Sequence, residues 1–532
     1  MAPPIETVPA EKPDPLPIAQ ELTDRAVDRP LSETPSGCLT FVKQTGGDGL
    51  YRPERPTKLR NSLLAGVGFL ELANAGDFAA NVWNEIPVPV HAIVLMALGA
   101  SVALGILYFA VQDARLSWAN VCGLRAERRH LHQALGDARR QHGDVKDKAM
   151  VRTLACLLDV NFRETGTELV DRLGMDVCMG FGALTVGVGT FMAIGGANRN
   201  VFFASNLLSG YVGNAPCALY GLANLFWSLF VWRRAHRHRR AGATSTTTTT
   251  TTGLAGGRIE QMLQARVARV QLHSALNGVT GVVAGAASLV TATMWWGYVV
   301  LIPCIASSVL ANYIWRHRIG YQRPLAAQQH AVVSFDEEST VAELAFVDAS
   351  RRRWRQPRSS DPFAGLVAKP DSISCVVEFI VRNRLFEAFC LRVLADAQVC
   401  ALTAALVDTA SDTVTIRAES LAAVTDDAVR GRLIDLAWAV MTGAAPKCFR
   451  DQENALLEVL GCLLCRPVDA NEKPEAPVVA EDPATVSTTE SSVGLSTSDG
   501  LAGPHEPVAA LEQVVVVDAT EQEHDGGRVI IS

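Results

Sequence analysis

The sequence predicts an all-α membrane protein with about six transmembrane helices in three helical hairpins, followed by a cytosolic helical domain and flanked by disordered tails. Three observations support this fold class: long apolar runs without charge, an internal repeat, and arginine clusters that lie beside the apolar runs. Hydrophobic residues make up 48% of the 532 residues, and charged residues make up 19%. The mean hydropathy of +0.16 is high for a soluble protein.

Four apolar runs define the predicted membrane part. Residues 86–111, 177–197, 201–232 and 274–315 contain no Asp, Glu, Lys or Arg. Each of the first three is long enough for a spanning helix of about 20 residues. The fourth would be about 63 Å long as one helix, twice the thickness of a bilayer core of about 30 Å, so it must fold back. We expect the turn at Met-Trp-Trp-Gly-Tyr (294–298), because Trp and Tyr prefer the headgroup level.

A repeated motif predicts how the helices pair. The segments "GYVGNAPCALYGLANLFW" (210–227) and "GYVVLIPCIASSVLANYIW" (297–315) share Gly-Tyr-Val, Pro-Cys, Ala-Asn and Trp in the same order. A helix rich in Gly and Ala precedes each copy's Pro-Cys and a basic cluster follows its Trp, so each repeat is predicted to be a helical hairpin. A degenerate third copy covers 61–111. Glu71 and Asp77 interrupt its first helix, so five helices are the alternative to six.

Composition assigns the remaining segments. The chain opens with polar, proline-rich residues and not with the apolar core of a signal peptide, so we expect the first spanning helix to act as the targeting signal. The predicted organisation is a disordered arm (1–60) with local order at 39–53, hairpin one (61–111), cytosolic amphipathic helices (112–173), hairpin two (174–232), a basic and Thr-rich linker (233–257), hairpin three (258–315), a basic juxtamembrane linker (316–370), a cytosolic helical domain (371–466) and an acidic disordered tail (467–532).

The distribution of charge predicts the orientation of the chain. Residues 467–532 carry 13 Asp and Glu against two Lys and Arg, so the net charge of −7 hides a positive remainder. With six helices, the basic segments all fall on one face, and the opposite loops offer only Arg199. The positive-inside rule then places the basic face and both termini in the cytosol. We expect a lipid bilayer as the partner and no nucleic acid, with plasma membrane and endomembrane both open.

The stretch "GMDVCMGFGALTVGVGTFMAIGGANRNVFFASNLLSGYVGNAPCALYGL" (174–222) resembles a group of multi-pass integral membrane proteins of filamentous fungi. The resemblance covers roughly residues 35–325. It implies that the membrane half forms one unit and that the tails vary. It implies no activity and assigns no functional residue.

Four polar residues in the first helix of hairpin one form a candidate polar path: Glu71, Asn74, Asp77 and Asn81. Their spacing places them on one side of a helix, and an ionisable group inside a span costs about 2.5–3.5 kcal/mol on insertion scales. One hypothesis is a polar wall that lines a path for a solute or protons. The other, which the sequence favours, is that this stretch is the outer end of the helix or an interfacial helix, with its acids in water.

Asn224 and Asn312 occupy matching positions in the two clear repeats. They could form a symmetric polar pair at a pseudo-symmetric substrate site. The favoured interpretation is hydrogen bonding between helices, worth about 0.6 kcal/mol each. Small-residue faces such as Gly281-x-x-x-Gly285 predict close helix packing, either within the chain or in a homo-oligomer.

The basic cluster "RRRWRQPR" (351–358) follows the last predicted span. Its arginines form a candidate lipid-surface site: Arg351, Arg352, Arg353, Arg355 and Arg358. Each would contribute about 1 kcal/mol near anionic lipid, and a solvated basic linker is the equal alternative. We find no metal-ligand pattern, nucleotide loop or nucleophile elbow, so we expect no catalytic residue, no metal and no cofactor.

Two hypotheses of different class follow. The favoured one is a non-enzymatic membrane organiser or anchor that presents the helical domain and the tail, residues 371–532, to cytosolic protein partners. The other is a transporter or channel for a small solute or protons through the hairpin bundle, motivated by the parallel repeats and the polar residues 71–81. An enzyme that acts on lipid is a distant third.

Overall fold

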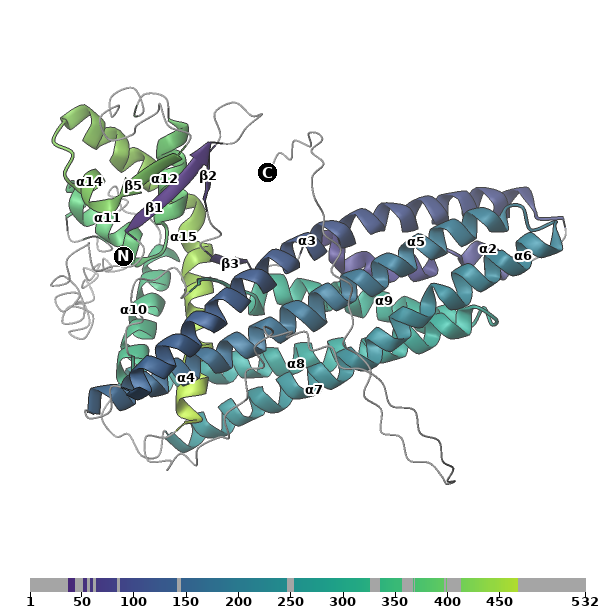
Figure 1. Ribbon diagram of the computed structural model, residues 1–532, viewed down its shortest axis with the longest axis horizontal. Coiled ribbons are helices and arrows are strands. Elements are labelled where there is room, and N and C mark those ends of the chain that lie inside the picture. The colour runs from purple at the N-terminus through teal and green to yellow at the C-terminus, as the bar shows by residue number, and fades with distance from the viewer. Residues whose placement is uncertain are drawn as a thin grey trace, which may run out of the picture. The chain divides into compact units, whose positions relative to one another are not determined.

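The computed structural model is mostly helical within the part of the chain that it describes (Figure 1). The described residues are 37–43, 51–54, 58–60, 64–83, 87–140, 145–245, 253–325, 335–355, 367, 369–396, 399 and 413–466. The acidic tail, the Thr run and most of the first 60 residues therefore lie outside the described residues.

Five helices among the described residues are long and apolar enough to cross a membrane. They are Val90–Arg140, Lys148–Ala193, Arg199–Ala243, Gly257–Thr291 and Gly297–Ile319. Large apolar side chains such as Val94, Leu219 and Ile302 are exposed on their outer surfaces. This outward apolar surface is what a bilayer would cover, and it explains why the chain is apolar without a proportionate buried core.

These five helices comprise ten elements. The helices are α3 (Val90–Arg140), α4 (Val145–Gly166), η3 (Thr167–Gly174), α5 (Met175–Ala193), α6 (Arg199–Asn206), η4 (Leu207–Val212), α7 (Asn214–Ser245), α8 (Gly253–Thr291), α9 (Gly297–Ile314) and η5 (Trp315–Ile319), of which α9 and η5 follow the break that separates them from α8. The long helices run side by side as a bundle (Figure 1).

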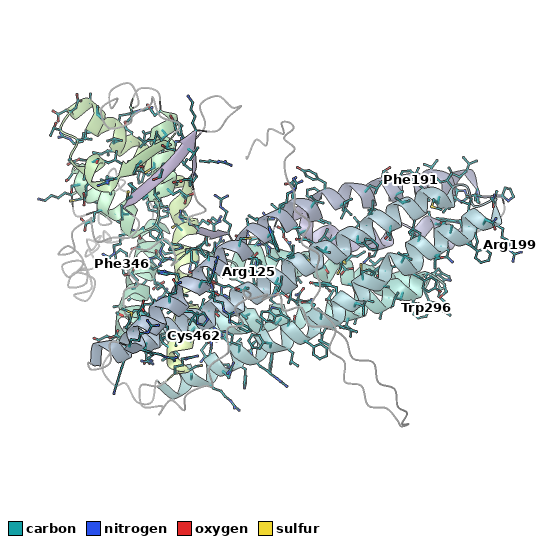
Figure 2. All side chains as sticks on the ribbon, viewed as in Figure 1. Arg125, Phe191, Arg199, Trp296, Phe346 and Cys462 are labelled. Carbon is teal, nitrogen blue, oxygen red and sulfur yellow. The ribbon has the colours of Figure 1, made fainter. Side chains whose placement is uncertain are left out.

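The break between α8 and α9 spans residues 292–296, which include Trp295 and Trp296. It overlaps the turn that the sequence places at 294–298. Figure 2 shows Trp296 and Arg199 at the same end of the bundle, which we call the turn end, while Arg125 lies toward the opposite, basic end. Arg199 packs over the ring of Phe203, with 5.7 Å between the guanidinium carbon and the ring centroid.

The helix α3 continues well past the apolar run that begins it. Its 51 residues correspond to roughly 77 Å at 1.5 Å per residue, more than twice the thickness of a bilayer core. Residues 112–140, expected as a separate amphipathic segment, are the second half of this same helix. The segment 145–193 is likewise one continuous helix across the boundary that the sequence places at residue 174.

The first predicted membrane segment has a different form. Ala65–Ala75 is the 3₁₀ helix η2, and Phe78–Val82 is the short helix α2. The segment η2 packs against α3, α5 and α9 inside the bundle. A 3₁₀ helix rises about 2.0 Å per residue, so the 11 residues of η2 extend about 22 Å.

Glycine allows two of the helices to approach closely. A Cβ atom at Gly221 of α7 would lie 2.3 Å from the backbone oxygen of Gly281 in α8. A Cβ atom at Gly285 would lie 2.7 Å from the Cα atom of Ala218. The small-residue face Gly281-x-x-x-Gly285 is therefore used for packing within the chain.

A separate hydrophobic core defines a second body, which we call the head domain. It comprises the strands β1 (Cys38–Lys43), β2 (Tyr51–Pro53) and β5 (Thr413–Arg417), the helices α11 (Ile373–Arg382), α12 (Phe386–Ala395) and α14 (Ala418–Ala422), and the first half of α15 (Asp427–Leu464). Its three antiparallel strands are ordered β2-β1-β5. The sequence indicates local order at 39–53 but does not identify β5 as its partner.

Three more elements lie between the head domain and the bundle. The strand β3 (Lys58–Arg60) precedes the first bundle segment, the strand β4 (Gln322–Pro324) follows the last bundle helix, and the two pair in antiparallel register. The helix α10 (Glu337–Arg355) lies in the segment that the sequence assigns to a juxtamembrane linker, and it packs along α15. The helix α15 begins at Asp426, whose side chain accepts hydrogen bonds from the backbone N–H groups of Ala428 and Val429.

Candidate functional site

The polar residues of η2 and α2 face the interior of the bundle. The hydroxyl of Tyr298 on α9 donates a 2.8 Å hydrogen bond to Oδ1 of Asp77, and the side-chain amide of Asn81 donates a 2.6 Å hydrogen bond to the same hydroxyl oxygen. Asp77 is fully buried. Its second oxygen, Oδ2, is also buried and has no hydrogen-bond partner among the described residues. A buried carboxylate that is only half satisfied is costly, which is typical of functional positions.

Glu71 and Asn74 form a second polar group deeper in the bundle. Asn74 donates a 3.0 Å hydrogen bond to Oε2 of Glu71, and the Sγ atom of Cys217 on α7 lies 4.0 Å from Oδ1 of Asn74. Asn74 is buried and Glu71 is half-buried. The side chains of the candidate polar path therefore contact other helices of the bundle.

A central cavity brings several sequence-predicted residues together. It has a volume of about 60 Å³. A water molecule needs about 10–15 Å³ of such space, so the central cavity has room for about four waters. Glu71, Asn224 and Asn312 all line it, although they lie on three different helices.

The two repeat-related asparagines have different partners in the bundle. Asn224 pairs with Asn277 of α8. The side-chain amide of Asn224 donates a 3.3 Å hydrogen bond to the backbone carbonyl of Asn277, and the side-chain amide of Asn277 donates a 3.2 Å hydrogen bond to Oδ1 of Asn224. Asn312 donates a 3.3 Å hydrogen bond to the backbone carbonyl of Leu64, just before η2. Both contacts join helices, and both side chains also border the central cavity.

A buried ionic cluster lies beside the central cavity, and its arginine, Arg172, lines that cavity. Arg172 of η3 donates 2.8 Å hydrogen bonds to Asp113 of α3 and to Glu168, four residues before it. The amide of Asn120 donates a 3.0 Å hydrogen bond to Glu168. Asp176 lies beside this cluster and adds a further carboxylate. The cluster therefore contains more carboxyl groups than guanidinium groups.

A second cavity, about 30 Å³ in volume, lies at the basic end. It shares five lining residues with the central cavity: Thr167, Asp171, His273, Asn277 and Trp315. A third cavity, about 80 Å³ in volume, lies at the turn end, and Asn81 lines it. Water-sized spaces with polar lining thus occur at the turn end, at the centre and at the basic end, and the turn-end cavity shares no lining residue with the other two.

Each of the three π-helical segments η3, η4 and η5 lines one or two of these cavities. Thr167 and Asp171 of η3 border both the central and the basic-end cavity, and so does Trp315 of η5. Ser209 of η4 borders the turn-end cavity. A π segment inserts one extra residue into a helix and redirects its side chains, and such segments are frequent at functional sites. The backbone irregularities therefore coincide with the polar interior.

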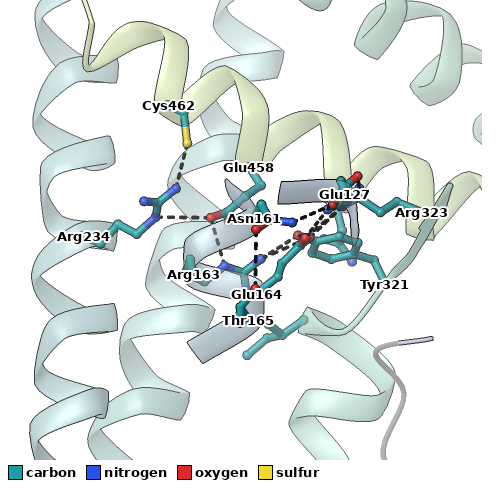
Figure 3. Close-up of polar contacts among 12 residues, drawn as sticks. Glu127, Asn161, Arg163, Glu164, Thr165, Arg234, Tyr321, Arg323, Glu458 and Cys462 are labelled. Carbon is teal, nitrogen blue, oxygen red and sulfur yellow. Dashed lines mark hydrogen bonds and ion pairs between the residues drawn. The ribbon is translucent and has the colours of Figure 1, made fainter. Parts of the chain in front are cut away.

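At the basic end, the second half of α15 enters the bundle and completes a buried ionic network (Figure 3). Arg323 pairs with Glu127 at 2.7 Å and also with Glu164. Glu164 accepts a 2.6 Å hydrogen bond from the hydroxyl of Tyr321, whose oxygen in turn accepts one of 2.6 Å from Arg163.

Glu458 of α15 lies at the centre of the same network. Guanidinium nitrogens of Arg163, Arg234 and Arg266 lie 3.4, 3.5 and 3.2 Å from its carboxylate oxygens. Burial raises the pKa of Glu458, but these arginines outweigh burial and hold that pKa well below its usual range. Glu458 therefore stays ionised at neutral pH.

The arginines that the sequence assigns to a lipid surface lie on or just beyond α10. Arg351 forms an ion pair with Glu453 of α15, and Arg352 lies 3.0 Å from Asp348. Arg353 and Arg355 belong to α10, but their side chains are outside the described residues, as is the whole of Arg358. Arg351 and Arg352 thus make ion pairs within the protein.

Comparison with protein-family models, with curated proteins and with solved structures finds no match. The resemblance to fungal membrane proteins therefore stays a prediction. The coarse class rests on the structure itself, whose described residues are mostly helical and include five apolar helices of membrane-spanning length.

Sequence reasoning missed Asp171, Arg172, Asp113 and Glu458. The first three lie in or next to a charged stretch that the sequence assigns to surface helices, because helical periodicity does not reveal whether a charge is paired in the interior. The spacing of Glu168 and Arg172 by four residues was a usable signal for an ion pair on one helix face.

Proposed function

We propose that this chain is an integral membrane protein whose helix bundle conducts protons through its polar interior. The observation that carries the proposal is the series of water-sized cavities and carboxyl groups between the turn end and the basic end. In this proposal η2 and α2 form a sixth crossing beside the five long helices, in three hairpins. The 22 Å of η2 and the residues of α2 together approach the thickness of a bilayer core.

Charge and size favour protons over a larger solute. From η2 to the ionic cluster, the interior residues include one guanidinium, that of Arg172, and six carboxyl groups: Glu71, Asp77, Asp113, Glu168, Asp171 and Asp176. Three further guanidinium groups, those of Arg163, Arg234 and Arg266, line the basic-end cavity. Carboxylates in excess are stable in a low-dielectric interior only when a proton or a cation accompanies them. Cavities of about 30–80 Å³ hold a few waters each, which suits a relay along carboxyl groups, a tyrosine hydroxyl and water.

Proton flux into liposomes tests the proposal. The purified protein is reconstituted with a pH-sensitive dye inside the vesicles, and flux is driven by a potassium gradient with a potassium carrier. We expect flux in the wild-type chain and at least a tenfold lower rate in the double variant Glu71→Gln/Asp77→Asn. Asp137→Asn, which changes an exposed acid of α3, serves as the matched control and should leave the flux unchanged.

Equal flux in the wild-type chain and the double variant would remove Glu71 and Asp77 from the pathway. An absence of flux from every form of the protein would contradict the proposed function.

A second candidate is the membrane organiser that the sequence favours, with the basic face and both termini in the cytosol. The observation in its favour is the head domain's own hydrophobic core, which includes Phe386, Phe389 and Phe449 and is distinct from the bundle clusters. The organiser predicts that cross-linked protein partners are lost when the chain ends at residue 466. It also predicts no proton flux from any form of the purified protein.

A further inference from the structure

The helix α15 belongs to two bodies at once. Its first half, from Val429 to Phe449, contributes to the core of the head domain. In its second half, Leu457 and Leu460 pack with residues of α7, α8 and α10, while Cys462 and Leu463 pack with Cys156 and Val160 of α4. One continuous helix therefore connects the head domain to the basic end of the bundle.

The second half of α15 forms part of the wall of the basic-end cavity. Leu457 and Glu458 line this cavity together with Asp171 and His273, which also line the central cavity. The side chains of α15 thus stand between the polar interior and the space beyond the basic end.

Docking of α15 adds an acid to a group of buried arginines. Arg163, Arg234 and Arg266 are each at most 5% exposed and surround the carboxylate of Glu458. Two of them also pair with acids of α4, since Arg234 lies 2.8 Å from Asp159 and Arg163 lies 3.9 Å from Glu164. The helix α15 also supplies Oδ1 of Asn454 to Arg266 at 2.9 Å. Without α15 these buried guanidinium groups would lose an acid, and water would have to enter to solvate them.

A bending point lies in the last turn of the first half of α15. Pro446 lies inside the helix, and proline removes one backbone hydrogen bond from the ladder. Sharp bends in helices occur mainly at such positions. Movement of the head domain can therefore change the angle of the second half without unfolding the first.

We propose that residues 454–464 of α15 are a built-in gate that closes the basic end of the polar interior and opens when the head domain moves. The gate rests on the proposed function, because it regulates the same proton path. Docked, it excludes water from the arginine cluster and blocks the exit next to Asp171. Displaced, it leaves a positively charged, hydrated opening.

The first test compares two buried glutamates of the same helix. Glu458→Gln removes the acid that holds the three arginines, and Glu453→Gln removes an equally buried acid that pairs with Arg351 and does not line the cavity. We expect Glu458→Gln to raise the proton flux of the full-length chain in liposomes at least tenfold, and Glu453→Gln to leave it within twofold. Equal flux in both variants would overturn the gate.

The second test needs no transport. Ser274, a buried residue of the basic-end cavity, is changed to Cys, and its reaction with a membrane-impermeant maleimide is followed by site-resolved mass spectrometry. The gate predicts at least tenfold faster labelling of Ser274→Cys when Glu458→Gln is added, but not when Glu453→Gln is added. Equal labelling rates would refute it.

The two tests separate the gate from the proton path. Faster labelling without flux would support a gate and contradict proton conduction, whereas flux without any effect of Glu458→Gln would support conduction and contradict the gate. If Glu458→Gln does not fold, Leu457→Ala/Leu460→Ala keeps every charge and weakens the apolar docking of α15. The gate predicts faster labelling and higher flux for this variant as well.

Discussion

The hydroxyl of Tyr298 lies 2.8 Å from Oδ1 of Asp77, although 221 residues separate them in the chain. The contact joins α9 to the residue that precedes α2, and both side chains are buried. It places the acid of the first polar segment inside the bundle.

Removing this hydroxyl should destabilise the protein. Tyr298→Phe leaves Asp77 without its donor in a buried position, and an unsatisfied buried polar group costs about 1–3 kcal/mol. We expect a lower thermal unfolding temperature in detergent. Tyr313→Phe, on the exposed side of the same helix, is the control and should unfold like the wild-type protein. Identical unfolding of the two variants would show that the contact contributes nothing.

The close crossing of α7 and α8 makes a steric prediction. Gly221→Ala puts a methyl group 2.3 Å from the backbone oxygen of Gly281, so the two helices must separate. Overpacking of this kind costs about 1–3 kcal/mol. Gly105→Ala on α3, where nothing lies within 4 Å of the new Cβ atom, should leave stability unchanged or slightly increased. Unfolding in detergent compares the two, and a stable Gly221→Ala protein would contradict the close approach.

The ionic network at the basic end predicts unequal effects of removing arginines. Arg323→Gln leaves the buried acids Glu127 and Glu164 without their main counter-charge, and breaking a buried pair in this way costs about 3–5 kcal/mol. Arg140→Gln removes an exposed pair with Asp137 and should change stability by less than about 1 kcal/mol. Chemical denaturation measures both. Similar small effects would mean that the network is hydrated.

Asp451 predicts a pH dependence of stability. Burial raises the pKa of this carboxyl from 3.8 to about 6, against the opposing effects of Lys447 and Arg450. The folded state therefore holds the proton more tightly than the unfolded state, so stability should fall as the pH rises from about 4 to about 6. Asp451→Asn should remove this dependence and stabilise the protein at pH 7 by up to about 3 kcal/mol.

The comparison for Asp451 is a set of unfolding curves between pH 4 and pH 7. If the difference in unfolding free energy between the wild-type protein and Asp451→Asn is the same at every pH in this range, Asp451 is ionised in the folded protein without cost.

The sequence predicts the apolar helices well because their signal is local. Uncharged runs set the five long helices, and Trp295 with Gly297 indicates the break between α8 and α9. The 3₁₀ form of Ala65–Ala75 is not predictable in the same way, since it depends on the helices that surround it. The strand β5 is also invisible, because its partner β1 lies about 375 residues earlier.

The site was only partly predictable for a related reason. The polar residues at 71–81 stand out because charge is expensive in an apolar segment. Glu458 does not stand out, because it lies in an ordinary amphipathic helix and its three arginines come from α4, α7 and α8. No periodic pattern relates residues that meet only in the folded chain.

Asp171 provides the most direct test of proton conduction, because it lines both the central and the basic-end cavity. The measurement is proton flux into liposomes for Asp171→Asn, made in the wild-type chain and in the Glu458→Gln background. The proposed path predicts at least a tenfold loss of flux in both backgrounds, with Asp137→Asn unchanged. Undiminished proton flux in Asp171→Asn would contradict the proposed path. So would an absence of proton flux from both the wild-type chain and the Glu458→Gln variant.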